Sequence, residues 1–245
     1  MLHEIRRQSA WRLDGKRMET LHPRDVPEAL TTLYLRLNGF FTSGLVLHSP
    51  QRGRVRSDID CLAVRHPFHD QSEREVDPDP FLELGKTPEL LLCEVKSSVH
   101  SLSFNKPLRT DPATIDAFFR WSGLIRSDRV KEAVDAFVPH LQDGTPEAVV
   151  RAGVSFDGVR IRALLCCPGC SEEDVKDRWC ASGVRMMGYA NRCLNPKVPR
   201  ERCSTVYPLN LWGGYLEPLV AYFKGLRRAE TPTFQDLRAK VARAT

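Results

Sequence analysis

The chain of 245 residues contains no long hydrophobic run. Its most apolar stretches, such as Leu90–Cys93, are far shorter than the roughly 20 residues that a membrane-spanning helix needs. The N-terminal segment carries Arg6 and Arg7 but lacks the apolar core of a secretory signal. We therefore expect a soluble, cytoplasmic globular protein with no membrane partner.

Sequence motifs of several common enzyme classes are also missing. The chain has neither a G-x-G-x-x-G nor a G-K-[ST] phosphate loop, and it lacks the G-x-S-x-G elbow of serine hydrolases. Its histidines show no H-E-x-x-H or comparable metal-binding spacing. Aromatic residues make up only 8% and do not form the base-stacking pattern of an RNA-recognition motif. These absences argue against the corresponding nucleotide-binding, hydrolase, metalloprotease and RNA-binding classes.

Charge is distributed unevenly along the chain. Hydrophobic residues make up 42% and charged residues 27%, as in an ordinary globular protein, and the net charge is +5. Residues 151–245 hold 16 basic and 9 acidic side chains, a net charge of +7, whereas residues 1–150 hold 20 and 22, a net charge of −2. A basic C-terminal third suits a polyanion such as nucleic acid, although an arginine-rich surface alone gives the same count.

Eight cysteines occur in the chain, and without a secretion signal we expect them to be reduced thiols. Cys61 and Cys93 lie inside apolar runs and are expected to be small core residues. The other six fall within residues 166–203. Among them, Cys167-Pro-Gly-Cys170 has the spacing of a Zn²⁺-binding pair, but no second close pair completes four ligands. Buried thiols are therefore favoured over a Zn²⁺ site at Cys167 and Cys170.

Apolar periodicity and turn residues predict the order of secondary structure. Helices are expected over residues 25–37, from 111 onward, and over 127–141, 171–180, 209–226 and 233–242; strands are expected over 40–48, 55–64, 89–97, 148–155 and 159–166. This order predicts an α/β fold with a mixed central β-sheet flanked by helices. The expected organisation is an N-terminal leader (1–22), an α/β core (23–170) and a basic, mainly helical C-terminal extension packed on the core (171–245).

Charged residues interrupt the apolar strand expected over 89–97. Glu94 and Lys96 are two positions apart and therefore lie on one face of the strand, where burial is costly unless the charges are paired or used. The neighbouring strand carries Asp58 and Asp60. Carboxylates on adjacent strands can hold Mg²⁺, and a lysine beside them can orient water or stabilise a phosphate. The alternative is a buried ion pair without a catalytic role.

The succession of a helix, a strand, a strand with an aspartate and a strand bearing E-x-K resembles the PD-(D/E)xK nuclease superfamily. More narrowly, it is similar to the archaeal Holliday-junction resolvases and the Mrr-type restriction endonucleases. The resemblance covers Arg24–Ser98, under a third of the chain. It implies a restriction-endonuclease-like αβββαβ core and Mg²⁺- or Mn²⁺-dependent hydrolysis of DNA phosphodiester bonds.

The resemblance also assigns site residues. Asp60, Glu94 and the carbonyl of Val95 match the metal ligands, and Lys96 matches the residue that positions the attacking hydroxide. Glu28 lies in the first predicted helix, near the position of the resolvases' helix glutamate; a solvated first-turn glutamate is the alternative.

Three features depart from the family pattern. Ile59 replaces the proline that precedes the motif's aspartate, and Asp58 competes with Asp60 for the metal-binding role. Asp60 is preferred because an apolar run follows it. The connection between Asp60 and Glu94 is longer than in the simplest resolvases, which indicates an insertion between the two strands.

Two functions from different classes remain in view. The favoured one is a metal-dependent nuclease acting on DNA in repair, restriction or defence, since Asp60, Glu94 and Lys96 are all present. The other is a non-catalytic nucleic-acid- or protein-binding module with a nuclease-like fold and a Cys-rich C-terminal segment. RNA as substrate and a homodimer stay open as well. Basic residues that could contact phosphates are Arg160, Arg162, Arg200 and Arg202, and the alternative for each is a solvated surface arginine.

Overall fold

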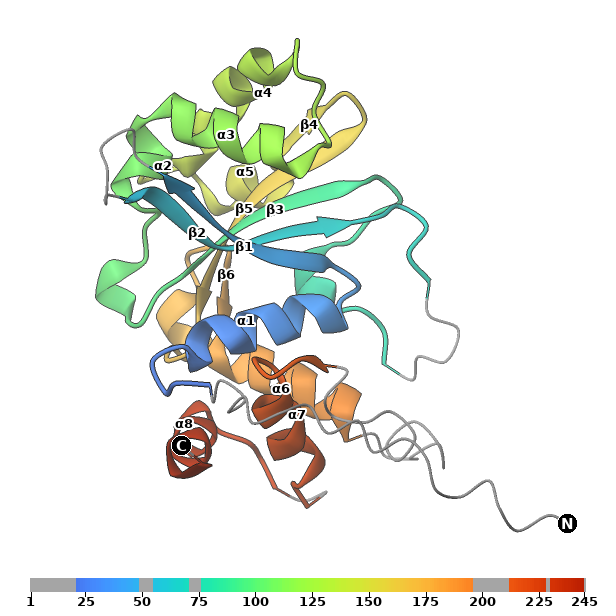
Figure 1. Cartoon of the computed structure of the whole chain (residues 1–245), viewed down its shortest axis with the longest axis vertical. Helices are drawn as coiled ribbons and strands as arrows, with labels where there is room; N and C mark the ends of the chain where they lie inside the picture. Colours follow the sequence, from blue (N-terminus) through green and yellow to red (C-terminus); the bar gives the residue numbers. More distant parts are fainter. Residues whose placement is uncertain (1–20, 49–54, 71–75, 196–211, 228–229, 245) are drawn as a thin grey trace, which may run out of the picture.

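The computed structural model describes residues 21–48, 55–70, 76–195, 212–227 and 230–244. A mixed six-stranded sheet runs through the middle of the molecule and has helices on both faces (Figure 1). This architecture confirms the predicted α/β fold. No helix within these ranges has the length and apolar character needed to cross a membrane.

The sheet has the strand order β1-β2-β3-β5-β4, and β6 pairs with β5 as well. Its strands are β1 (Phe41–His48), β2 (Val55–Arg65), β3 (Glu89–Val95), β4 (Val154–Phe156), β5 (Val159–Cys167) and β6 (Cys180–Ser182). The pairs β1–β2, β2–β3 and β4–β5 are antiparallel, whereas β3–β5 and β5–β6 are parallel. The central strands β3 and β5 are therefore covered on both faces, as their near-continuous apolar sequences require.

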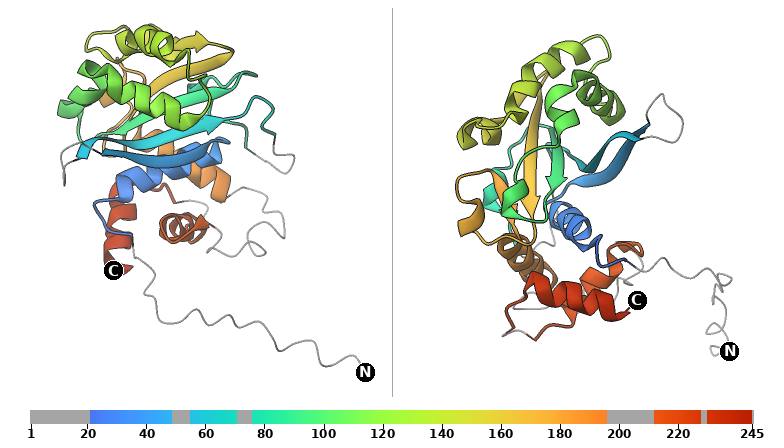
Figure 2. Two further views of the ribbon diagram at one scale, coloured as in Figure 1. Left: turned by 45° about the horizontal axis from the view of Figure 1, so that its top comes forward. Right: turned by 90° about the vertical axis from the view of Figure 1, so that its left-hand side faces the viewer.

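Helices form one layer on each side of the sheet, as the two views in Figure 2 show. One layer contains α1 (Val26–Leu37), α6 (Gly183–Leu194), α7 (Glu217–Lys224) and α8 (Phe234–Ala244). The other contains α2 (Lys106–Thr110), α3 (Pro112–Ser122) and α4 (Val130–Phe137), with α5 (Glu147–Ala152) against β5. Short 3₁₀ helices occupy Pro80–Leu82, Val99–Ser101, Val138–Leu141 and Glu173–Val175.

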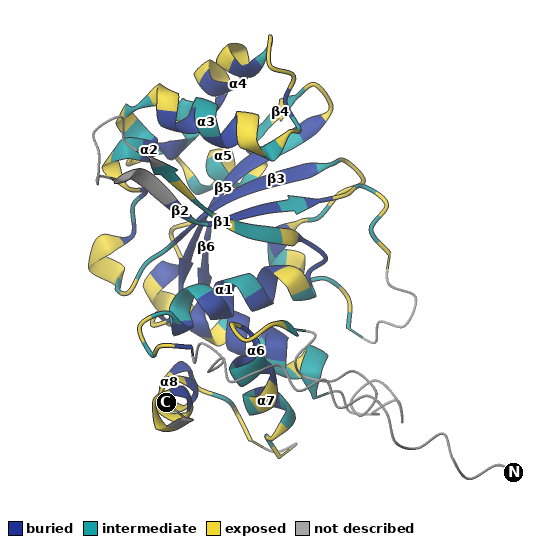
Figure 3. Ribbon diagram, viewed as in Figure 1, coloured by how far each residue is buried: buried dark blue, intermediate teal, exposed yellow. Residues whose placement is uncertain are grey.

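Two apolar cores result, one under each helical layer (Figure 3). In β3, Leu91 and Cys93 pack toward α1 and α6, whereas Leu90 and Leu92 pack toward α2–α4. This alternation follows from the two-residue period of a strand. Cys61 and Cys93 are 1% and 0% exposed, which confirms that they are core residues.

The first predicted helix is confirmed as α1. Leu30 and Leu33 are fully buried, and Pro27 lies in the first turn, where its missing N–H breaks no helical hydrogen bond. The helix ends at Asn38 and Gly39, whose φ of +85° favours glycine. A Cβ on Gly39 would lie 2.3 Å from the ring of His69, so the position also needs a residue without a side chain.

The strand predicted over 148–155 is wrong for most of its length. Glu147–Ala152 forms α5, which begins after Pro146 and ends at Gly153, where φ is +67°. Only Val154–Phe156 is extended and pairs with β5. The apolar run here is too short for its periodicity to separate a buried strand from a helical turn. A hairpin turn at Asp157 joins β4 to β5, with positive φ there and at the following glycine.

Residues 180–194 hold two elements that the sequence did not indicate. β6 extends the sheet past the boundary expected at residue 170, and α6 packs its fully buried Met186 against α1. The helix predicted over 171–180 is reduced to the 3₁₀ turn Glu173–Val175. The Ser182 hydroxyl caps α6 by accepting the Arg185 N–H at 3.0 Å. The two glycines within this helix weaken its sequence signal.

Candidate active site where β2 and β3 separate

The candidate site lies where the pairing between β2 and β3 ends. The last paired residues of the two strands are Cys61 and Cys93. One step further, the Asp60 carboxylate accepts the backbone N–H of Val95 at 2.6 Å. A side chain from β2 therefore takes the place that a backbone carbonyl of β2 would hold in a continued ladder. This contact brings Asp60 against the middle residue of the E-x-K motif.

A β-bulge sets the direction of Asp60. Ser43 of β1 pairs with Leu62, but Leu45 pairs with Ile59, so the single residue Gly44 opposes both Asp60 and Cys61. As a result, Ile59 and Leu62 pack into the same core although they are three positions apart. A bulge redirects a side chain and ends regular pairing, which is what the site requires of Asp60.

Glu94, Lys96 and Asn105 form a closed ring of hydrogen bonds. The Lys96 ammonium donates to Glu94 Oε1 at 2.8 Å and to Asn105 Oδ1 at 2.9 Å. The Asn105 backbone N–H donates to Glu94 Oε2 at 2.8 Å. The side chain of Glu94 is only 3% exposed and that of Lys96 is 11% exposed. Glu94 and Lys96 thus form a buried ion pair, the arrangement that the sequence offered as the alternative to a catalytic site, and Asn105, just beyond the motif, is their shared partner.

The electrostatics of Glu94 indicate that a second carboxylate is near. Burial raises the pKa of Glu94, and the negative charge of Asp60 raises it further. The bonds from Lys96 and Asn105 act in the opposite direction and lower the pKa. Desolvation and the Asp60 charge both disfavour ionised Glu94, so a cation between the two carboxylates would relieve both effects.

Glu28 lies in the first turn of α1 and is partly exposed. Its negative charge acts on Tyr215, a 42%-exposed residue just before α7. Burial raises the pKa of Tyr215 most strongly, and the charges of Glu28, Asp25 and Asp60 raise it further. Tyr215 therefore lies within electrostatic range of both Glu28 and Asp60. Its position far along the chain gave no sequence signal for this placement.

The donor atoms at the site suit a hard divalent cation. Asp60 and Glu94 supply carboxylate oxygens, and the carbonyl of Val95 points to the same side of its strand as the N–H that Asp60 accepts. Mg²⁺ and Mn²⁺ prefer such oxygen ligands, and Mg²⁺ keeps several waters, so few protein ligands suffice. Within the described ranges, no group of three or more His, Cys, Asp or Glu is arranged to hold a metal ion. The fit therefore rests on these two carboxylates with one carbonyl.

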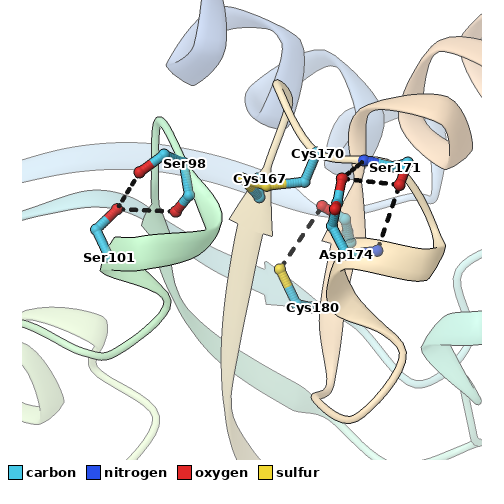
Figure 4. The surroundings of a disulfide bond; sticks show 8 residues. Ser98, Ser101, Cys167, Cys170, Ser171, Asp174 and Cys180 are labelled. Carbon is cyan, nitrogen blue, oxygen red and sulfur yellow. Dashed lines mark hydrogen bonds between the residues drawn. A yellow bond between two sulfur atoms is a disulfide. The ribbon is translucent and has the colours of Figure 1, made fainter.

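The cysteine pair differs from the expectation of reduced thiols. Cys167 and Cys170 form a disulfide at the end of β5, shown in Figure 4 with Cys180 and the loop bearing Ser98 nearby. A disulfide offers no thiolate, so in this state the pair cannot serve as Zn²⁺ ligands. Burial raises the pKa of Cys180 to about 12, so this free thiol is unreactive at neutral pH.

Arg162, predicted to contact phosphate, is wholly buried, and that prediction is wrong. Its guanidinium pairs with Glu89, donates to the Leu82 carbonyl at 2.7 Å and lies 4.5 Å from the ring centroid of Trp179. Desolvation lowers its pKa to about 10.

Arg160 also has a structural role. Its guanidinium donates to the carbonyls of Ala152, Glu83 and Arg151 at 2.9–3.1 Å. These bonds use three of the five N–H donors of the guanidinium. Arg200, Arg202 and the side chain of Asp58 lie outside the part of the chain that is described.

Comparison with protein-family models, curated proteins and solved structures gives no match for this chain. The resemblance to PD-(D/E)xK nucleases consequently depends on the site: Asp60 beside the E-x-K of β3, with Glu28 on the helix that precedes the sheet.

Proposed function

We propose that this protein is a metal-dependent nuclease that hydrolyses phosphodiester bonds of DNA. The observation that carries the proposal is the contact of Asp60 with the Val95 N–H, because it brings a carboxylate of β2 to the backbone between Glu94 and Lys96 of β3. Two carboxylates and a lysine at the end of a central strand are the groups that metal-assisted phosphodiester hydrolysis needs.

In this proposal Asp60, Glu94 and the Val95 carbonyl hold one Mg²⁺ or Mn²⁺. Glu28 reaches the cation through a water, because no three carboxylates of the described ranges are arranged to bind one ion directly. When bound, the cation supplies Lewis-acid stabilisation of the phosphate and lowers the pKa of a water molecule.

The role of Lys96 follows from its three ammonium donors. Two of its N–H groups are directed by Glu94 and Asn105. A third is then oriented by the tetrahedral geometry of the ammonium, and it holds the attacking water or a phosphate oxygen. The positive charge of Lys96 also offsets charge that develops on the phosphate in the transition state.

Charge favours a nucleic acid as the substrate. The net charge of +7 in residues 151–245 attracts a polyanion, and the exposed Lys106 follows Asn105 directly in the chain. Contacts of this kind position a backbone without reading its sequence. RNA shares the same phosphate chemistry and is included among the test substrates.

One observation favours the alternative of a non-catalytic binding module. Both oxygens of Glu94 already accept hydrogen bonds, one from Lys96 and one from Asn105. A closed network of this kind is stable without a cation. Each carboxylate oxygen has a second lone pair, however, so these bonds and a metal ion are compatible.

The test is cleavage of plasmid, branched DNA, single-stranded DNA and RNA in Mg²⁺, Mn²⁺ or EDTA. Asp60→Asn, Glu94→Ala and Lys96→Ala are compared with the wild type and with Lys131→Ala, an exposed lysine that pairs with Asp135 on α4. Metal-dependent cleavage lost in the three site variants and kept in Lys131→Ala supports the proposal. Cleavage that persists in the site variants contradicts it, and binding of DNA without cleavage of any substrate supports the binding module.

A further inference from the structure

Asn105 holds both charged residues of the E-x-K motif, but through different atoms. Its backbone N–H donates to Glu94 Oε2, whereas its side-chain Oδ1 accepts from the Lys96 ammonium. The first contact does not depend on the side chain and the second depends on it entirely. The substitution Asn105→Ala therefore removes the hydrogen bond to Lys96 and keeps the backbone hydrogen bond to Glu94.

The side chain of Asn105 is diverted from its usual role. Asn105 occupies the N-cap position of α2, where an asparagine oxygen normally accepts a backbone N–H from the first turn, yet it makes no capping bond. Pro107 lies in that turn and has no N–H to donate. The amide oxygen is turned to Lys96 instead.

The loop that carries Asn105 is anchored to the body of the protein. Leu102 and Phe104 are buried in the core beneath α2–α4, and the Leu102 carbonyl accepts a hydrogen bond from Arg178. These contacts fix the backbone on the N-terminal side of Asn105. The amide oxygen is consequently presented to Lys96 by a rigid support, which a positioning role requires.

We propose that Asn105 is a positioning residue that keeps the Lys96 ammonium in the site when Glu94 also binds a cation. This inference rests on the proposed nuclease function. Without the cation, Lys96 is held by the full charge of Glu94 and by Asn105 together. Once Glu94 shares its charge with a metal ion, its attraction for Lys96 weakens, and the neutral amide remains as a partner whose strength is unchanged. A neutral acceptor also adds no charge that would compete for the cation.

The experiment compares Asn105→Ala with Asn105→Asp, which keeps an oxygen at the same place, and with Ser103→Ala, a control in the same loop. Steady-state cleavage in Mg²⁺ gives kcat and KM. Separately, metal-free protein in EDTA receives a pulse of acetic anhydride, and mass spectrometry gives the acetylation rate of Lys96 relative to the exposed Lys86. Calorimetry with Mn²⁺ measures cation affinity, which depends on Glu94 and Asp60.

We expect Asn105→Ala to lower kcat by about 10- to 100-fold, the loss typical of a hydrogen bond to a charged group, with KM and Mn²⁺ affinity little changed. Acetylation of Lys96 rises in Asn105→Ala and stays at or below the wild-type rate in Asn105→Asp, whose carboxylate still accepts from Lys96 and favours the protonated ammonium, while Ser103→Ala matches the wild type throughout. If the wild type cleaves DNA and Asn105→Ala has the same kcat and the same Lys96 acetylation, the positioning role is overturned. If the wild type cleaves no substrate, the proposed nuclease function is contradicted and the inference about Asn105 is contradicted with it. This outcome can be told from the previous one, in which the wild type cleaves DNA and only the role of Asn105 is contradicted.

Discussion

The Asp60 carboxylate accepts the backbone N–H of Val95 at 2.6 Å, so a side chain of one strand completes the hydrogen bonding of the next. The contact requires the bulge opposite Gly44, which turns Asp60 out of the regular alternation of β2. It also explains why the β2–β3 ladder ends at this point. Structure and proposed chemistry therefore depend on the same carboxylate.

Substitution of Asp60 should separate these two roles. Asp60→Asn keeps an oxygen for the Val95 N–H but removes the charge, so we expect stability within about 1 kcal/mol of the wild type and a loss of cleavage of about 100-fold or more. Asp60→Ala leaves the N–H without its acceptor and should lower the free energy of unfolding by about 1–3 kcal/mol. Urea denaturation and a cleavage assay on both variants test this. Equal stability of the two variants would contradict the structural role of the contact.

Glu94 should make stability depend on pH in a defined direction. Burial raises the pKa of Glu94 in the folded protein. The resulting contribution to the free energy of unfolding is fully present below the pKa that Glu94 has in the unfolded chain, and it is lost as the pH rises through the pKa that Glu94 has in the folded protein. We therefore expect the free energy of unfolding of the wild type, relative to Glu94→Gln, to fall as the pH rises from about 4 upward, since an unperturbed glutamate titrates near about 4.3. Urea titrations at a series of pH values measure the difference. A difference that stays constant with pH, or rises, would be inconsistent with a raised pKa.

Arg162 should matter for stability and not for DNA contact. Arg162→Met leaves the Glu89 charge buried without its partner, and loss of one member of a buried pair typically costs about 3–5 kcal/mol. The double variant Arg162→Met/Glu89→Leu should regain much of this loss. Arg126→Ala, which removes an exposed pair with Asp128, is the control and should change stability by less than about 1 kcal/mol. A loss for Arg162→Met as small as the control's would argue against the buried pair.

The Cys167–Cys170 disulfide should add modest stability. It closes a loop of only a few residues, for which chain entropy predicts about 2 kcal/mol. We expect a phosphine reductant to lower the unfolding temperature of the wild type but not that of Cys167→Ala/Cys170→Ala. Alkylation followed by mass spectrometry counts the thiols before and after reduction. Full alkylation of both cysteines in the denatured, unreduced protein would rule the disulfide out.

Local sequence patterns predicted the elements that carry the site. The apolar stripe of α1 and the apolar runs of β1, β2, β3 and β5 each have a clear period or length, and each element is present. The sequence also offered a buried ion pair as the alternative role of Glu94 and Lys96, because two charges on one face of an apolar strand need partners, and the two side chains are paired. Asp60 could be assigned to the same site because β2 and β3 are neighbours in the sheet.

Contacts between distant parts of the chain could not be predicted in this way. Arg162 has the spacing of a surface residue, and its burial depends on Glu89 and Trp179 from other elements. Asn105 reaches Glu94 because of the course of the loop after β3, and the segment before α7 brings Tyr215 within electrostatic range of Asp60. These placements are set by tertiary packing, which overrides the local pattern.

The most direct test of the central claim is single-turnover cleavage of a labelled DNA duplex at increasing Mg²⁺, with wild type, Lys96→Met and Lys131→Met measured side by side. Both substitutions remove one lysine charge, but only Lys96 lies at the separation of β2 and β3. We predict Mg²⁺-dependent cleavage by the wild type and by Lys131→Met, and a rate lower by about 100-fold or more for Lys96→Met. Equal rates for all three proteins, or no cleavage by the wild type at any Mg²⁺ concentration, would contradict a nuclease site at Asp60, Glu94 and Lys96.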